Sequence, residues 1–172
     1  MKKSSISALP RKNAIVANII EALDTRKSFM VLGHKNPDED CIASMVAFAL
    51  LVTKFEKEAC ICTDGDIHEH FSYLLNICTH NSIDLIDGSG NLPPGIDTVA
   101  ICDTPKPDMI YFGGFAQSLM TEKDIVKIEI DHHLQADSAY SGDPDYALVD
   151  EASSASELVG LVALKLCGRE DL

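Results

Sequence analysis

The stretch FMVLGHKNPDEDCIAS, residues 29–44, joins a short apolar run to a polar loop and then to an amphipathic segment. The apolar run lacks polar alternation, which is typical of a strand buried on both faces of a parallel sheet. Pro37 biases Asn36 toward extended geometry, and Asp40 is expected to cap a helix that begins near Cys41. The stretch therefore predicts a strand, a polar loop and a helix, which together form the repeating unit of an α/β fold.

The same succession of apolar runs and amphipathic segments continues along the chain. The expected strands are 29–32, 59–63, 83–86, 98–102, 125–130 and 146–149, and the expected helices are 11–23, 41–53, 67–78, 114–120 and 154–166. The fifth strand alternates around Glu129, which indicates a position nearer a sheet edge. We predict a Rossmann-like α/β fold, with a doubly wound, mostly parallel β-sheet flanked by helices.

Composition bounds the class of protein. With 172 residues, 46% of them hydrophobic, the chain can build a real core in one domain or slightly more. The longest apolar run, residues 45–52, is far shorter than the roughly 20 residues that a membrane span needs, and the N-terminal residues lack an apolar signal region. Six cysteines without a C-x-x-C pair fit a reducing compartment. We therefore expect a cytoplasmic protein with no membrane partner.

The net charge of −13 argues against a general grip on nucleic-acid phosphates, because such a grip needs clustered Lys and Arg. Two explanations for the acidity stay open. Most surface carboxylates serve solubility, whereas a cluster of Asp in a small volume is tolerable only when a cation offsets the repulsion.

Polar residues follow four of the expected strands at their carboxyl ends. Because the carboxyl ends of parallel strands share one edge of the sheet, groups that are distant in sequence are expected to meet there. The groups are the loop 34–40, then Asp103, then 131–133 and finally Asp150. Aspartate oxygens mixed with imidazole suit Mn²⁺ or Mg²⁺, and also Co²⁺ or Fe²⁺, better than a thiolate zinc site. The competing interpretation is that the aspartates are turn and cap residues and the histidines solvated loop residues.

The motifs GHKNPDEDCIAS, Asp103, DHH at 131–133 and Asp150 before EASSASELV resemble, in order, those of the DHH phosphoesterase family. That family includes manganese-dependent pyrophosphatases, exopolyphosphatases and phosphodiesterases of short nucleotides. The resemblance implies an α/β domain that binds two divalent cations, Mn²⁺ first, with Mg²⁺ or Co²⁺ as alternatives. It further implies a bridging water that the cations activate as nucleophile.

The resemblance also implies a role for each matching residue. The metal ligands would be His34 and Asp38 for one cation, Asp40, His132 and Asp150 for the other, and Asp103 as the bridge. His133 would contact the scissile phosphate, and Asp131 would orient its neighbours. Ser154 is first of all a helix cap with Glu157 as its capping-box partner, and a phosphate contact is the minority interpretation.

The expected organisation is a single DHH domain over residues 1–172 without the usual C-terminal substrate-binding domain. The later motifs favour a phosphodiesterase of short oligonucleotides, and a pyrophosphatase or exopolyphosphatase is the first alternative. A non-catalytic binding module, or a truncated domain that needs a partner, is the alternative of another class. The expected partner is a phosphate-containing small molecule or short oligonucleotide, and a homodimer is left open.

Overall fold

The computed structural model describes residues 2–63, 71–88, 92–112 and 116–168. Its centre is a six-stranded sheet in the order β3-β2-β1-β4-β5-β6, and every strand pair is parallel. The strands are β1 (Ser28–Leu32), β2 (Glu58–Cys62), β3 (Asp84–Ile86), β4 (Thr98–Cys102), β5 (Val126–Asp131) and β6 (Ala147–Val149). The predicted doubly wound α/β fold is confirmed, and all six expected strands are present.

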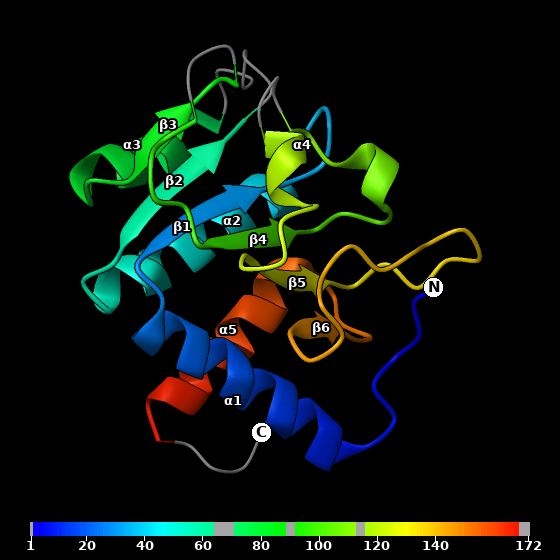
Figure 1. Cartoon of the computed structure of the whole chain (residues 1–172). Helices are drawn as coiled ribbons and strands as arrows, with labels where there is room; N and C mark the ends of the chain where they lie inside the picture. The colour runs from blue at the N-terminus through cyan, green and yellow to red at the C-terminus, as the bar shows by residue number, and fades with distance from the viewer. Residues whose placement is uncertain (1, 64–70, 89–91, 113–115, 169–172) are drawn as a thin grey trace.

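Helices lie between β1 and β2, between β2 and β3, and between β4 and β5, and two more precede β1 and follow β6 (Figure 1). They are α1 (Leu9–Thr25), α2 (Glu39–Lys54), α3 (Ser72–His80), the 3-10 helix η2 (Pro107–Met109), α4 (Ala116–Leu119) and α5 (Ala155–Leu166). Residues 67–70 of the third expected helix and 114–115 of the fourth lie outside the described residues. None of the described helices is long and apolar enough to cross a membrane.

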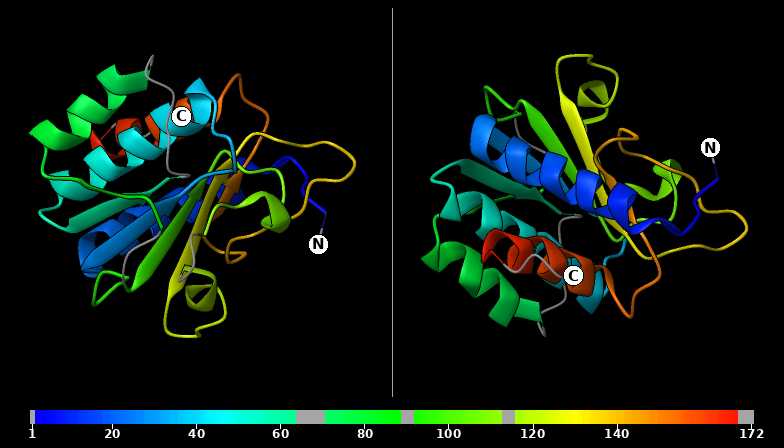
Figure 2. Two further views of the ribbon diagram at one scale, coloured as in Figure 1. Left: turned by 90° about the horizontal axis from the view of Figure 1, so that it is seen from above. Right: turned by 90° about the horizontal axis from the view of Figure 1, so that it is seen from below.

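Two apolar layers cover the sheet. Buried residues of α1, α2, α3 and α5 form one cluster with alternate residues of the strands, such as Phe29, Ala100 and Ile128. The opposite faces of the same strands, with Met30 and Ile101, pack against Ile110 and Leu119. Figure 2 shows α2, α3 and α5 together on one side of the sheet and α4 on the other. Burial of every residue of β1 and β4 explains their unbroken apolar sequences.

The strand order reverses between β1 and β4, because the chain runs outward to β2 and β3 before it returns to β4. In an open parallel sheet a crevice forms outside the carboxyl ends of the strands at such a reversal. The loops after β1 and β4 both lead into this region, and Asp103 extends the ladder through its amide, which donates to the carbonyl of Ile130. The fold therefore places the predicted polar groups at the crevice.

Two local predictions in the loop after β1 are wrong. Asn36 has φ +52°, the left-handed conformation that Asn tolerates, and not the extended geometry expected before Pro37. The helix cap is Asp38, whose carboxylate accepts a hydrogen bond from the amide of Cys41. Asp40 is thereby in the first turn of α2, where its side chain is free to contact another element.

Candidate metal centre

Asp103 lies at the centre of the predicted site, at the end of β4. Its side chain is only 2% exposed, and its backbone has φ +49°, which a non-glycine residue seldom adopts. Its Oδ1 atom is buried and accepts no hydrogen bond. Burial, with the negative charge of Asp40 as second cause, raises the pKa of Asp103 to about 6. The negative charge of this buried carboxylate is therefore not fully compensated, and a bound cation would compensate it.

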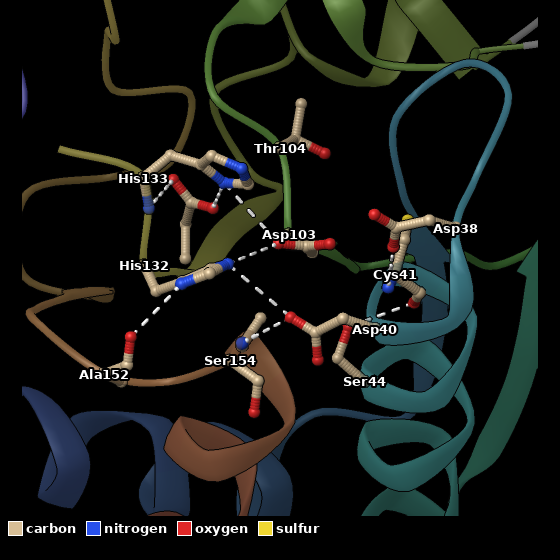
Figure 3. A network of polar contacts seen from close by, with 12 residues as sticks. Asp38, Asp40, Cys41, Ser44, Asp103, Thr104, His132, His133, Ala152 and Ser154 are labelled. Atoms are coloured by element: carbon tan, nitrogen blue, oxygen red, sulfur yellow. Dashed lines mark hydrogen bonds and ion pairs between the residues drawn. The ribbon is translucent and has the colours of Figure 1, made fainter. Parts of the chain in front are cut away.

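Histidines approach Asp103 from both sides. Nε2 of His34 is 3.8 Å from Oδ2 of Asp103. Nε2 of His132 is 3.3 Å from Oδ1 of Asp103 (Figure 3). Nε2 of His34 is also 4.0 Å from Asp38, and Nε2 of His132 is 3.6 Å from Asp40. The structure therefore brings together five of the six predicted metal ligands.

Backbone carbonyls orient both imidazoles. Nδ1 of His34 is 2.8 Å from the carbonyl oxygen of Lys35, and Nδ1 of His132 is 3.3 Å from that of Ala152. A carbonyl oxygen can only accept, so Nδ1 carries the proton in each ring. In the neutral imidazole the Nε2 lone pair then faces the carboxylates, which is the usual orientation of a metal-ligating histidine.

Two groups of ligand atoms are close enough together to be candidates for holding one cation each. His34, Cys41 and Asp103 form the first group, and Asp103, His132 and His133 form the second; within each group the atoms lie within 4.8 Å of one another. Asp103 belongs to both, as a bridging carboxylate would. The donor set, and the Asp103 oxygen that accepts no hydrogen bond from the described residues, thus fit a pair of divalent cations.

Asp40 joins the site to α5. Its carboxylate accepts hydrogen bonds from the amides of Ala155 and Ser156, at 2.7 and 3.1 Å, and from the Ser156 hydroxyl at 2.7 Å. These amides belong to the first turn of α5, where free N–H groups and the helix dipole favour a carboxylate. Asp40 was expected to cap its own helix, but it caps one that is more than a hundred residues away.

The second histidine of the DHH sequence has a different partner from the first. Nδ1 of His133 is 2.7 Å from Oδ1 of Asp131, and this hydrogen bond is the main reason that the pKa of His133 is raised. Burial alone would raise the pKa of Asp131, but its hydrogen bonds with His133 and Lys3 hold that pKa below the ordinary value. Asp131 therefore contacts the ring that it is predicted to orient, and its role stays a prediction.

Lys3 supplies the charge that stabilises Asp131. Its ammonium group is completely buried, 2.6 Å from Oδ2 of Asp131 and 2.8 Å from Oε1 of Glu129, and it donates to the carbonyl of Thr104 at 2.6 Å. Glu129 is buried as well. The alternation around Glu129 indicated a strand near a sheet edge, and β5 is the neighbour of the edge strand β6. A buried lysine between two carboxylates compensates charges that would otherwise be costly.

Asp150 is engaged by the N-terminal segment. Its Oδ1 accepts from the Ser5 hydroxyl and from the amides of Ile6 and Glu151, and its Oδ2 is 2.8 Å from the ammonium group of Lys12. Burial opposes ionisation, yet the hydrogen bonds from Lys12 and Ser5 lower the pKa of Asp150. The structure does not bring its carboxylate into either group of ligand atoms.

Ser154 is the N-cap of α5, and its hydroxyl accepts from the amide of Glu157 at 3.1 Å, as the capping interpretation predicted. The reciprocal contact differs from the expected box, because the Glu157 carboxylate binds the amide and hydroxyl of Ser153. These contacts account for the hydroxyl of Ser154 without a phosphate.

Sequence reasoning missed Cys41 and Lys3. Cys41 directly follows the aspartates of the loop, so its position in the motif was a usable signal. Burial raises the pKa of its thiol well above the ordinary value. Lys3 contacts residues more than a hundred positions away, and its place in the sequence offers no signal of that contact.

The chain is similar to several curated proteins. A probable manganese-dependent inorganic pyrophosphatase from Streptococcus agalactiae serotype Ia is 30% identical over 134 residues, or 76% of this chain and 39% of that protein. A protein of the same description from Streptococcus thermophilus is 26% identical over 129 residues, or 75% of this chain and 38% of that one. The chain thus spans about two fifths of the length of these relatives.

A solved structure shares the fold. The crystal structure of an exopolyphosphatase-related protein from Bacteroides fragilis matches with a TM-score of 0.66 and 16% identity, over 90% of this chain and 44% of that chain. The family model described as "DHH family, N-terminal domain" matches residues 28–170, which include every predicted ligand. This chain therefore belongs to the DHH family.

Proposed function

We propose that the chain holds two divalent cations and hydrolyses phosphoester or phosphoanhydride bonds. The observation that carries the proposal is the shared orientation of His34 and His132. Each ring directs Nδ1 to a backbone carbonyl and Nε2 to carboxylates at 3.3–4.0 Å. This arrangement lets both Nε2 atoms and the carboxylate oxygens serve as ligands of a cation that lies between them.

The proposed ligands divide between two positions that share Asp103. His34 and Asp38 would hold the first cation, and Asp40 and His132 would hold the second. When bound, such a pair lowers the pKa of a coordinated water and neutralises charge on phosphate oxygens. The relatives named manganese-dependent favour Mn²⁺, and the donor types also admit Mg²⁺ or Co²⁺.

His133 is proposed to contact the scissile phosphate. Its Nδ1 is engaged by Asp131, which leaves Nε2 as the free nitrogen. The raised pKa of His133 favours the protonated ring, so Nε2 can donate a charge-assisted hydrogen bond to a phosphate oxygen. Asp131 would act through His133 by fixing its orientation and its charge.

Two substrate classes are supported by different observations. The named pyrophosphatase relatives favour a phosphoanhydride. A short oligonucleotide is favoured by a cavity of about 460 Å³ lined by Lys35, Tyr111 and Phe112, among others. It adjoins the site, since Lys35 follows His34 and Ile110 pairs with His34 through a β-bridge. Aromatic side chains stack on bases of any sequence.

The test measures Mn²⁺ binding by calorimetry and turnover of pyrophosphate, polyphosphate, a dinucleotide and bis-p-nitrophenyl phosphate. Asp103→Asn should abolish both binding and turnover, and Asp84→Asn, at an exposed position of β3, is the matched control. Phe112→Ala should lower kcat/KM for the dinucleotide and leave pyrophosphate hydrolysis unchanged if the cavity binds a base. Absence of cation binding would refute the proposal, and binding without any turnover would favour a non-catalytic module.

Asp150 stays a predicted ligand of the second cation, and one variant decides its role. Coordination would require its carboxylate to release Lys12, because that ammonium group contacts Oδ2. Asp150→Asn should weaken Mn²⁺ binding if Asp150 is a ligand. If it only anchors the N-terminal segment, the substitution should lower the free energy of unfolding and leave the Kd for Mn²⁺ unchanged.

A further inference from the structure

Cys41 lies where a ligand of the first cation would lie. Its sulfur belongs to the group in which the ligand atoms of His34, Cys41 and Asp103 are within 4.8 Å of one another. Zinc binds sulfur at about 2.3 Å and imidazole nitrogen at about 2.0 Å, so these two ligands of one ion are separated by at most about 4.3 Å. The ligand atoms lie within 4.8 Å of one another, so the group would contract around a bound ion.

The backbone fixes the position of the sulfur. Cys41 is in the first turn of α2, and its amide donates to the carboxylate of the N-cap Asp38. Its side chain occupies the space beside Gly33, where an added Cβ would be 2.4 Å from Sγ. Any larger residue at position 33 would displace the sulfur, so the glycine that precedes His34 provides the space for Cys41.

Asp103 gives an independent indication that a cation belongs beside this sulfur. Its carboxylate is in the same group of ligand atoms and is buried, and the oxygen recorded near His34 is Oδ2, 3.8 Å from Nε2. A buried carboxylate is costly unless hydrogen-bond donors or a cation compensate its charge. The thiol, the imidazole of His34 and this carboxylate therefore offer a mixed sulfur, nitrogen and oxygen site.

We propose that Cys41 is a thiolate ligand of the cation held by His34 and Asp103, an inference that rests on the proposed function. The metal–sulfur bond forms as the S–H bond breaks, and the proton leaves to solvent. The second position has only nitrogen and oxygen donors. The first is thus softer and should prefer Co²⁺ or Zn²⁺ to Mn²⁺, and the two cations need not be the same element.

Cobalt spectroscopy tests the sulfur directly. The protein is titrated with Co²⁺, and the visible d–d absorption and the near-ultraviolet thiolate-to-cobalt charge-transfer band are recorded. The wild type should show both. Cys41→Ser should keep d–d absorption and lose the charge-transfer band, and its Zn²⁺ affinity should fall by at least about tenfold, the least that loss of even an outer partner costs a metal site.

Cys60→Ser is the matched control, because Cys60 is also buried but packs in the apolar cluster on the other face of the sheet. It should leave the charge-transfer band intact. Cadmium NMR of the wild-type protein is a second test that needs no substitution. The chemical shift of the bound cadmium should be that of a site with a sulfur ligand. A poorly folded Cys41 variant therefore does not prevent the test.

The outcomes separate this inference from the proposed function. A wild-type protein that binds Co²⁺ without a charge-transfer band, or a band that survives in Cys41→Ser, overturns the role of Cys41 and leaves the two-cation proposal standing. A protein that binds no divalent cation overturns both.

Discussion

Asp103 and Asp131 end neighbouring strands of one sheet and are equally buried, but their environments are opposite. Asp131 is compensated by the ammonium group of Lys3, and its pKa is lowered. Asp103 has no buried lysine or arginine among its described partners, and its pKa is raised to about 6. The difference teaches that burial alone does not set the ionisation of a carboxylate: Lys3 supplies positive charge to Asp131, and we propose that an ion from solution supplies it to Asp103.

The largest expected effect follows from removing the built-in cation. Lys3→Met leaves buried Glu129 without its ammonium partner and Asp131 with His133 alone, so the free energy of unfolding should fall by about 3–5 kcal/mol. Urea denaturation at pH 7 measures the loss. The control is Lys2→Met at the neighbouring exposed lysine, which should change stability by less than about 0.5 kcal/mol. Equal stability of the two variants would show that the buried carboxylates do not depend on Lys3.

Asp103 should respond to pH in the opposite sense from a salt-bridged carboxylate. Its pKa is higher in the folded state, so the folded protein binds its proton more tightly, and stability should fall as pH rises from about 4 to above 6. Two pKa units correspond to a loss of about 3 kcal/mol. Urea denaturation in chelator across this range should show a steeper fall in the wild type than in Asp103→Asn. Parallel profiles would contradict the raised pKa.

A cation from solution should offset that cost. With free Mn²⁺ at one hundred times its Kd, stability should rise by about 2.7 kcal/mol, and the gain should be lost in Asp103→Asn. Thermal unfolding with and without Mn²⁺ measures it. A variant of Lys12, which contacts Asp150, should keep the gain if Asp150 is an anchor. A gain that persists in Asp103→Asn would place the cation elsewhere.

The smallest expected effect is on the free energy of unfolding when the N-cap of α5, Ser154, is replaced. Ser154→Ala removes the N-cap and should cost about 1 kcal/mol, while KM for the substrate stays constant. Chemical denaturation and steady-state kinetics distinguish the two interpretations of Ser154. A raised KM with unchanged stability would restore the phosphate contact that was the minority interpretation.

Local sequence predicted much of the fold and most of the proposed centre. Strands buried on both faces have unbroken apolar runs, and parallel strands end at one edge, so the sequence alone predicts that His34, Asp103 and His132 meet. The prediction for Asp40 was wrong because Asp38 and Asp40 are both competent caps, and local sequence does not say which of them turns toward a distant helix.

The sequence by itself determined the type of donor atoms and the strand ends that carry them, because apolar periodicity and residue chemistry are local properties. Only the tertiary structure decided how each charge is compensated. Lys3 reaches Asp131 across 128 positions, and Lys12 with Ser5 engages Asp150. The free energy of a buried charge depends on which groups surround it in space, and those groups are known only once the chain has folded.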